Sequence, residues 1–247
     1  MVVVLITTKE QEELLQEILD NVELPWNFGV YRETDEIDCD IDIDIISSIN
    51  NCYEGFYSLS GASKYVLLND TLPFVIKVPF NGYWEEDYDE DKDEYTGEFS
   101  FVDFEGSHFS PHNNYCAGET IIYDMMCKYA FEMFFAETKF FKKIDETPIY
   151  IQEKVIPYSS DKSKNFRSIK TSKLAEKLAS RTYINFPEAW IEAAICHYGK
   201  ELTEAFIVYL SSDDDVAEII REDLHSSNFG YRENGEPCIL DYSGYNC

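Results

Sequence analysis

Residues 223–241 read DLHSSNFGYRENGEPCILD, and this segment gives the strongest indication of how the chain folds. It follows a helical region and contains two strand-like runs on either side of Asn234-Gly235, the turn that a two-stranded hairpin requires. The runs are Phe229–Arg232 and Pro237–Leu240. Because the strands of a hairpin return to the same end, we expect Asn228 and Asp241 to lie close together.

Three oxygen-bearing side chains of this segment can then converge, those of Asp223, Asn228 and Asp241. Phosphoryl transfer requires magnesium held by hard oxygen ligands, which Asn228 and Asp241 can supply. It also requires a carboxylate that orients the attacking hydroxyl or accepts its proton, and Asp223 can supply that. Taken singly, the three are an ordinary surface aspartate, a turn asparagine and an aspartate that ends a hairpin. Their joint order and spacing favour a phosphate-handling site. His225 is expected only to shape the loop.

An antiparallel sheet is expected upstream of this segment, because short β-rich runs alternate with turn residues. Three strands are predicted around an Asn69-Asp70 turn, and a further pair is predicted later in the chain. The five runs are Phe56–Ser60, Tyr65–Leu68, Phe74–Val78, Phe140–Lys143 and Ile149–Val155. Lys77 lies in the third run, where it is either a functional cation or an edge-strand lysine that discourages aggregation.

Helices are predicted where apolar residues recur with a helical period. Residues 8–22 fit an amphipathic helix that begins with a capping box, residues 114–135 fit a second, and the chain before Arg221 is mostly helical. Glu119 shares the apolar face of the second helix, so its carboxylate is expected to point inward. An inward carboxylate requires a cation, and Lys77 is the natural candidate. Without Lys77, Glu119 is a common first-turn acid.

Composition and charge limit the classes of protein to which the chain can belong. With 247 residues, of which 45% are hydrophobic, it can bury a substantial core as one two-lobed domain or two small ones. A formal charge of −28 argues against a nucleic-acid-binding surface and favours a basic protein partner. No apolar run suits a secretion signal or a membrane span, so a soluble cytoplasmic protein is expected. The seven cysteines show no metal-ligand spacing and are expected to be reduced, mostly buried thiols.

Three charged stretches have more than one interpretation. Glu85–Glu98 holds nine carboxylates and the single base Lys92, which favours a solvated, mobile loop. Lys154–Arg181 reverses the charge, with eight bases and two acids; a solvated face is favoured over a binding site for an anionic partner. Residues 35–46 alternate Asp and Ile, as in a half-buried strand or the acidic start of a helix. They fit a calcium loop poorly, because isoleucines replace its glycine and its bidentate glutamate.

On these residues the chain resembles the protein-kinase-like superfamily, and especially short serine/threonine kinase-like proteins of bacteriophages and bacteria, over about residues 56–244. Asp223-Leu224 with Asn228, then Asp241 with Gly244, follows the family order D-L-x-x-x-N and D-x-x-G. Val75-Ile76-Lys77 is similar to the family's V-A-I-K strand. The resemblance implies an α+β, bilobal kinase-like fold with an antiparallel-sheet N-lobe and a truncated, mainly helical C-lobe. The N-lobe with an N-terminal extension would take residues 1–155, including an acidic insertion at about 84–110, and the C-lobe residues 156–247.

The same resemblance implies ATP and magnesium as cofactors. Lys77 and Glu119 would form the family's ion pair, Asp223 would be the catalytic base, and Asn228 and Asp241 would hold magnesium. The residues implied in nucleotide binding are Ser60, Gly61, Ala62, Ser63, Lys77, Gln152, Glu153 and Val155. The last three of these belong to the hinge near the adenine.

The chain departs from the family pattern in three places. The nucleotide loop, Ser58–Ser63, keeps small residues but only one glycine. Arg221-Glu222 replace the His-Arg that precedes the catalytic aspartate, and the sequence ends shortly after Asp241, before an activation segment. The substrate is therefore expected to be recognised by something else, or to be the protein itself.

The function predicted from these residues is Mg-ATP-dependent phosphotransfer to a hydroxyl, on Ser or Thr of a protein, including the protein itself. One alternative is a pseudokinase that serves as an interaction scaffold. A second, supported only by the charge of −28, is an acidic inhibitor that mimics nucleic acid and occupies a basic host protein.

Overall fold

A computed structural model describes residues 9–20, 30–31, 47–51, 53–60, 64–80, 82–89, 94–101, 114–144, 147–158, 169–181 and 186–242. These residues form a mixed α+β structure, which confirms the α+β part of the predicted fold class; the bilobal kinase-like arrangement stays a prediction. Contacts divide the chain into two compact units. The first is Met1–Ala117 with Thr138–Glu153, and the second is Gly118–Glu137 with Lys154–Cys247. The division at residue 155 that the sequence suggested stays a prediction.

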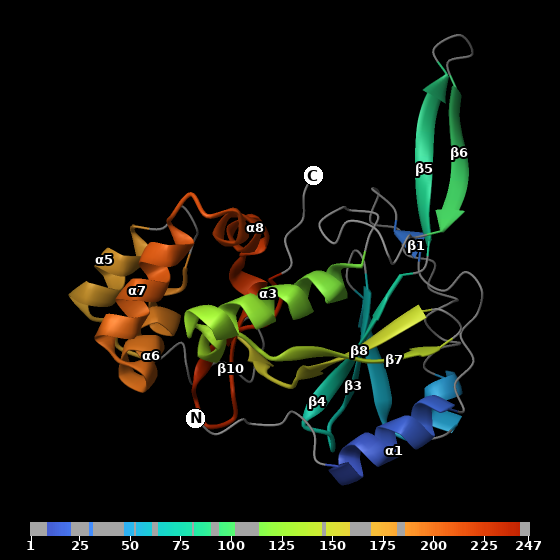
Figure 1. The fold of residues 1–247 in the computed structure, drawn as a ribbon, viewed down its shortest axis with the longest axis horizontal. Helices are drawn as coiled ribbons and strands as arrows, with labels where there is room; N and C mark the ends of the chain where they lie inside the picture. Colours follow the sequence, from blue (N-terminus) through green and yellow to red (C-terminus); the bar gives the residue numbers. More distant parts are fainter. Residues whose placement is uncertain are drawn as a thin grey trace. The chain divides into compact units, whose positions relative to one another are not determined.

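The first unit is built on a five-stranded antiparallel sheet with strand order β2-β3-β4-β8-β7 (Figure 1). The strands are β2 (Phe56–Ser60), β3 (Lys64–Asn69), β4 (Phe74–Pro79), β7 (Thr138–Ile144) and β8 (Thr147–Glu153). The sequence predicts all five, with ends that differ by at most two residues. Strand β4 pairs with a neighbour on each side and all six of its residues are buried. Lys77 is therefore not on an edge strand, and that alternative is wrong.

The turn between β3 and β4 is fixed by the side chain of Asn69, which is buried. Its Oδ1 accepts from the backbone and the hydroxyl of Thr71 at 2.9 and 2.7 Å, while its Nδ2 donates to the carbonyl of Glu54 at 3.0 Å. Beside it, Gly55 has φ +94°, and a Cβ there would lie 3.3 Å from the Asn69 amide. The predicted Asn69-Asp70 turn is confirmed, and side-chain hydrogen bonding of asparagine to the backbone explains it.

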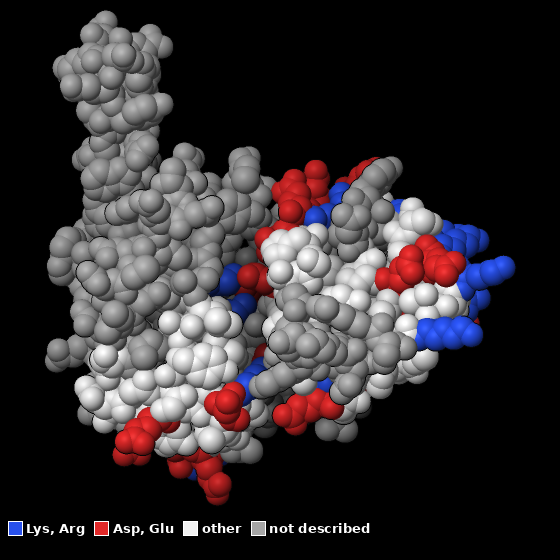
Figure 2. Space-filling model, turned by 180° about the vertical axis from the view of Figure 1, so that it is seen from behind, with Lys and Arg blue, Asp and Glu red and all other residues white. Residues whose placement is uncertain are grey.

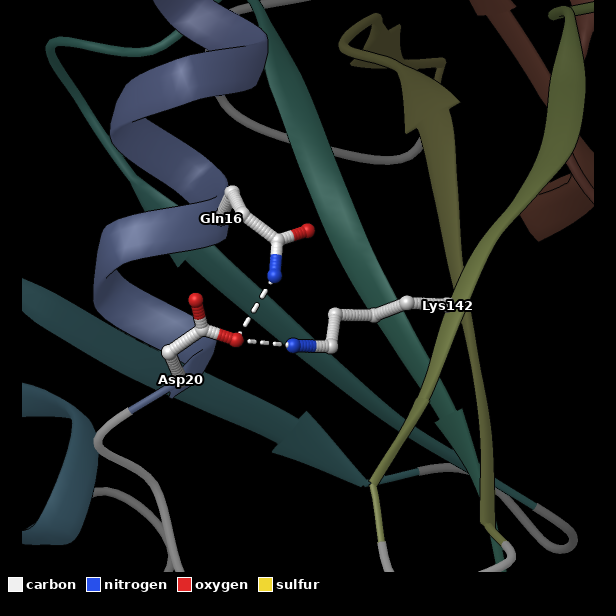
Figure 3. A network of polar contacts seen from close by, with 3 residues as sticks. All are labelled: Gln16, Asp20 and Lys142. Atoms are coloured by element: carbon white, nitrogen blue, oxygen red, sulfur yellow. Dashed lines mark hydrogen bonds and ion pairs between the residues drawn. The ribbon is translucent and has the colours of Figure 1, made fainter.

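Helix α1 (Lys9–Asp20) confirms the predicted amphipathic helix and buries Leu15, Ile18 and Leu19. Two ion pairs tie it to β7, since Lys139 Nζ lies 2.9 Å from Glu12 Oε1 and Lys142 Nζ contacts Asp20 Oδ1. In Figure 3, Lys142 and Gln16 converge on one carboxylate oxygen of Asp20, and the distance from Gln16 Nε2 is 2.6 Å. Burial of the apolar stripe holds α1 in place, and the two ion pairs orient the helix relative to β7.

The acidic stretch Glu85–Glu98 was expected to be a loop, and this is wrong for residues 85–89 and 94–98, whereas residues 90–93 lie outside the described part of the chain. Its residues form the antiparallel pair β5 (Gly82–Asp89) and β6 (Glu94–Phe101), with the two-residue strand β1 (Val30–Tyr31) parallel to β5 (Figure 1). The register places Trp84 opposite Phe99 and Tyr88 opposite Tyr95. Aromatic residues have high strand propensity, which accounts for two strands in a stretch of acidic composition.

Five α-helices, two short 3-10 helices (Glu132–Phe134 and Ser226–Asn228) and one small sheet make up the described part of the second unit. The helices are α3 (Tyr115–Tyr129, whose first three residues count with the first unit), α5 (Lys173–Ala179), α6 (Glu188–Tyr198), α7 (Lys200–Leu210) and α8 (Asp215–Asp223). The sheet has the order β11-β10-β9, with strands β9 (Ile156–Pro157), β10 (Phe229–Tyr231) and β11 (Pro237–Ile239). Its core is aromatic, with Phe134 stacked on Phe206 at a ring distance of 4.1 Å. The predicted helical region and hairpin are confirmed, although the second predicted helix ends at Tyr129.

Basic residues lie on the surface of the second unit, as Figure 2 shows on the side that carries α5. The described basic residues of the Lys154–Arg181 stretch that are exposed are Lys170, Lys173, Lys177 and Arg181. Short helix α5 begins at an N-cap, where Ser172 Oγ accepts from the backbone of Ala175 at 3.3 Å. Lys173 and Lys177 stand on its solvated face, in keeping with the favoured interpretation of this stretch.

Several sequence-based expectations concern residues that are only partly described. Residues 35–46, the nucleotide-loop residues 61–63 and Gly244 lie outside the described residues. Among the described cysteines, Cys116 and Cys238 are buried but Cys127 and Cys196 are exposed, so the expectation of mostly buried thiols is wrong for the latter two. Within the described part of the chain, no helix has the length and apolarity that crossing a membrane requires.

We expect Leu15→Ala to destabilise the protein by about 2–5 kcal/mol, because it removes a fully buried side chain and leaves a cavity under α1. Urea unfolding measures the change. Glu13→Ala in the same helix is the control, since its ion pair with Lys9 is exposed and should contribute almost nothing. Equal effects of the two changes would contradict the packing of α1 on the sheet.

The ion pair between Lys142 and Asp20 predicts a pH dependence. The hydrogen bond from Lys142 holds the pKa of the Asp20 carboxyl below its ordinary value. A depressed folded-state pKa contributes stability above the unfolded-state pKa, and this is lost as pH falls through the folded-state value. Melting curves should therefore show wild type more stable than Asp20→Asn at neutral pH, with the difference vanishing below about pH 4. A difference that is constant with pH would contradict this assignment.

Candidate functional site

The hairpin of β10 and β11 is built around two glycines. A Cβ at Gly230 would lie 2.8 Å from the carbonyl oxygen of Ile156, so only glycine lets β9 approach this closely. Gly235 has φ +89° in the turn, where Arg232 and Glu236 close the ladder through a backbone hydrogen bond of 2.8 Å. The Asn234-Gly235 turn is thus confirmed, and the two strands return the chain to Asp241.

The side chain of Asn228 joins the two ends of this segment. It is buried, and its Nδ2 donates to the carbonyl of Asp223 at 2.7 Å and to the carbonyl of Asp241 at 3.1 Å. Leu240 also donates its backbone N–H to the carbonyl of Asn228 at 2.8 Å. The predicted proximity of Asn228 and Asp241 is confirmed, and Asp223 is held at the same place.

These hydrogen bonds determine which atom of Asn228 can act chemically. Both partners are carbonyl oxygens, which accept but do not donate, so the amide nitrogen must face them. Its two hydrogens are used there, and Oδ1 is the atom that can ligate a cation. Amide and carboxylate oxygens are ligands that magnesium prefers, and magnesium keeps several waters or phosphate oxygens beside one or two protein ligands. Asn228 and Asp241 therefore fit magnesium, although the described residues contain no cluster of three or more His, Cys, Asp or Glu arranged for a metal.

Asp223 is the last residue of α8, and both ends of this helix are anchored. At its start, Asp214 Oδ1 accepts from the backbone of Val216 and Ala217 at 3.1 and 3.2 Å. Near its end, Arg221 Nη1 donates to the carbonyls of Leu210 and Ser212 at 2.6 and 2.5 Å. Arg221 therefore ties the end of α8 to the end of α7.

His225 shapes the loop between Asp223 and Asn228, as expected from the sequence. Its Nδ1 accepts from the backbone N–H of Ser227 at 3.2 Å and caps the short 3-10 helix Ser226–Asn228. The imidazole itself is exposed. It therefore positions Asn228 through the backbone of this short helix.

In the first unit, Lys77 is buried in the middle of the sheet. Its register partners are Val66 on β3 and Tyr150 on β8, and only 3% of its surface is exposed. An ammonium group at this depth requires a compensating partner, because burying an isolated charge is costly.

The Tyr150 hydroxyl accepts from Asn114 Nδ2 at 2.6 Å, and Asn114 Oδ1 accepts from the backbone of Ala117 at 3.1 Å. The start of α3 is thereby bound to β8.

The predicted hinge residues differ in burial and in the hydrogen bonds of their side chains. Gln152 is buried and its Nε2 donates to Thr138 Oγ1 at 2.7 Å, so its side chain cross-links β8 to β7. Glu153 ends β8, and Val155 lies in the connection to β9; both are partly exposed. Ser60 ends β2, whereas Gly61, Ala62 and Ser63 lie outside the described residues.

Glu119 is fully buried on α3, as are Ile122 and Met126 on the same face. The predicted inward orientation is confirmed. Lys77 belongs to the first unit, whereas Glu119, Asp223, Asn228 and Asp241 belong to the second. The ion pair of Lys77 with Glu119 therefore stays a prediction.

Sequence reasoning missed the residues that hold the hairpin in place. Arg232 donates to the carbonyls of Met133 and Phe135, both at 3.0 Å, and the Tyr198 hydroxyl lies 2.8 Å from the carbonyl of Pro237. Arg232 stands at the end of a strand before a turn, where an exposed base is common. No signal in the sequence distinguishes it from such a residue.

Comparison with models of known protein families gives no match for this chain, and no curated protein matches it.

We expect Asn228→Ala to destabilise the protein by about 1–3 kcal/mol, because two carbonyls lose their donor. Asn228→Asp should cost at least as much, since a carboxylate oxygen would face those carbonyls. Chemical denaturation measures both, with the neighbouring exposed change Ser227→Ala as control. If Asn228→Ala unfolds at the same denaturant concentration as this control, the amide does not hold the segment together.

Proposed function

We propose that this protein is a kinase-like phosphotransferase that binds Mg-ATP and transfers the γ-phosphoryl group to a hydroxyl. The observation that carries the proposal is the Asn228 amide, which is bonded to the backbone of both Asp223 and Asp241. This brings the three proposed polar residues together in the order that the D-L-x-x-x-N and D-x-x-G motifs require.

In the proposed reaction each residue of the second unit has a separate task. Asn228 Oδ1 and the Asp241 carboxylate hold magnesium, which neutralises charge on the phosphates. The Asp223 carboxylate orients the acceptor hydroxyl and takes its proton as the oxygen–phosphorus bond forms and the bond to ADP breaks. The connection from Asp223 to Asn228 is short and capped by His225, which keeps base and metal ligands at a constant separation.

In this proposal the nucleotide is bound by residues of the N-terminal lobe that the sequence predicts at 1–155. Lys77 is proposed to bind the α- and β-phosphates and to be the cation that Glu119 requires; the burial of both charged groups supports these roles. The backbone of Glu153–Val155 is proposed to bind the adenine, since the Gln152 side chain is bonded to Thr138. Ser60, Gly61, Ala62 and Ser63 are proposed to bind the phosphates, and the last three lie outside the described residues.

The acceptor is proposed to be Ser or Thr of a protein, including this protein. The charge of −28 favours a basic substrate, because an acidic one would be repelled over most of the surface. The chemistry that Asp223 offers suits any accessible hydroxyl, so a substrate is selected by charge and access.

Nucleotide binding is tested by melting the protein with and without Mg-ATP. A ligand at 100 times its dissociation constant stabilises by about 2.7 kcal/mol, so a rise of several degrees is expected. Asp241→Asn should lose most of the dependence on magnesium, while Asp213→Asn, an exposed aspartate of the same unit, should retain it. A wild-type protein that shows no shift at millimolar nucleotide would favour the acidic inhibitor instead.

Phosphoryl transfer is tested with γ-labelled ATP and a host lysate. Label should appear on the protein or on a lysate protein with wild type, and should fall by at least about a hundredfold with Asp223→Asn, because the general base is lost. Asp213→Asn should label like wild type. Mg-ATP binding without labelling would identify a pseudokinase scaffold. Equal labelling by wild type and Asp223→Asn would show that Asp223 is not the general base.

A further inference from the structure

The chain reverses direction where α3 ends. Tyr129 is the last residue of this helix, and Ala130 after it has φ 59°, a left-handed conformation that residues other than glycine rarely adopt. The backbone N–H of Ala130 donates to the carbonyl of Cys127 at 3.3 Å. The backbone N–H of Phe131 donates to the carbonyl of Met126 at 2.9 Å, which completes the Schellman pattern of helix termination. This turn brings Phe131 to the side of α7.

Three aromatic rings meet between the end of α3 and α7, all in the second unit. The ring centroid of Tyr209 on α7 lies 5.4 Å from that of Tyr129 and 5.5 Å from that of Phe131. Tyr129 is 44% exposed and Val208, next to Tyr209, is 59% exposed. The Tyr209 hydroxyl donates to Asp214 Oδ1 at 3.0 Å, which fixes the orientation of its ring. We call Tyr129, Phe131 and Tyr209 together the aromatic face.

Carboxylates lie near the aromatic face. Partial burial and the charges of Glu132, Asp124 and Glu137 raise the pKa of the Cys127 thiol above its ordinary value, so all three carboxylates act on the last turn of α3. Glu132 follows Phe131 directly, and its Oε2 is enclosed by protein without a hydrogen-bond partner among the described residues. Its charge is therefore poorly screened, and it attracts a nearby cation more strongly than an exposed carboxylate does.

The elements that carry the aromatic face are strongly acidic. Residues 124–137 and 200–215, all of them described, hold eight carboxylates and only two bases, Lys128 and Lys200. The C-terminal end of α3 adds the partial negative charge of a helix dipole at the same place. This combination suits a cationic ligand, because a ring face attracts a cation, and arginine stacks on rings while it bonds to carboxylates.

We propose that the aromatic face is a docking surface for a basic protein segment, whose arginine side chains stack on Tyr129 and bond to the carboxylates near it. A neutral apolar partner would cover these carboxylates without pairing them, which is costly. A second copy of this chain would be repelled, because each copy carries a charge of −28. The inference goes beyond the proposed function, since docking requires neither a nucleotide nor phosphoryl transfer.

The probe is a synthetic peptide that contains arginine and leucine but no Ser, Thr or Tyr, so that it cannot accept a phosphoryl group. Its binding to the full chain is measured by fluorescence anisotropy without nucleotide. A twin peptide with glutamine in place of each arginine removes the charge. A second twin with lysine in place of each arginine keeps the charge and removes the planar group that stacks on rings.

Two variants change the docking surface in different ways. Tyr129→Ala removes an exposed ring, and Asp124→Lys reverses an exposed charge. Tyr57→Ala is the matched control for the first, because Tyr57 is 43% exposed and belongs to the other unit. Glu176→Lys, at an exposed position on α5, is the control for the second. Circular dichroism checks that each variant is folded; if Tyr129→Ala is not, Asp124→Lys carries the test.

The arginine peptide is expected to bind wild type, and Tyr129→Ala and Asp124→Lys should each weaken it about tenfold, as loss of a cation–π contact or reversal of a nearby charge predicts. Both controls should bind it like wild type. The lysine peptide should bind more weakly, and the glutamine peptide should not bind measurably. Added salt should weaken binding, since the attraction is partly electrostatic.

Several results would overturn the proposal. No binding of the arginine peptide to wild type would do so, as would equal binding of the glutamine peptide. Equal losses in the two variants and their controls would place the peptide elsewhere on the acidic surface, and a lysine peptide bound as tightly as the arginine peptide would remove the role of the rings. A wild-type dimer that Tyr129→Ala converts to a monomer would assign the aromatic face to a second copy instead.

The outcome is separate from that of the proposed function. Because no nucleotide is present, a protein that binds the arginine peptide at the aromatic face but does not bind Mg-ATP would keep this inference and lose the proposed function. A protein that binds Mg-ATP but not the peptide would give the opposite result.

Discussion

The candidate site depends on one side chain, because the Asn228 amide bonds both to the end of α8 and to the chain that leaves the hairpin. The two amide hydrogens are bonded to the carbonyls of Asp223 and Asp241. Oδ1 is therefore the side-chain atom that can ligate a cation. The hairpin, the His225 cap and the anchored ends of α8 all serve to keep that geometry. Without it, the two aspartates would be unrelated surface residues.

The buried charged groups of Lys77 and Glu119 also favour a functional site. Lys77 lies at the centre of one sheet and Glu119 is fully buried on α3. Apolar residues of similar size would fold at least as well at both positions, since burying a charged group loses hydration free energy that its partners seldom repay. Charge retained in such places is typical of functional sites, where perturbed groups are assembled for chemistry. Stability in this protein comes instead from its aromatic core and from α1 on the sheet.

The acidic hairpin shows how a composition argument can fail. A run of carboxylates favours a solvated loop when the charges alone are considered. In β5 and β6, however, aromatic residues stand between the charges, and the backbone ladder forms in spite of like charges opposite each other, such as Glu85 and Glu98. Net charge therefore describes the surface of this protein better than it describes its local conformation.

The sequence by itself determined the five sheet strands, most of the helices, the Asn234-Gly235 hairpin, and the inward side of Glu119. These depend on local periodicity and turn chemistry, which neighbouring residues carry. Only the tertiary structure decided that Lys77 is central in its sheet, that Gln152 is bonded to Thr138, and that Arg232 binds the carbonyls after α3. Strand order and carbonyl partners join residues far apart in the chain, and no local pattern encodes which of them meet.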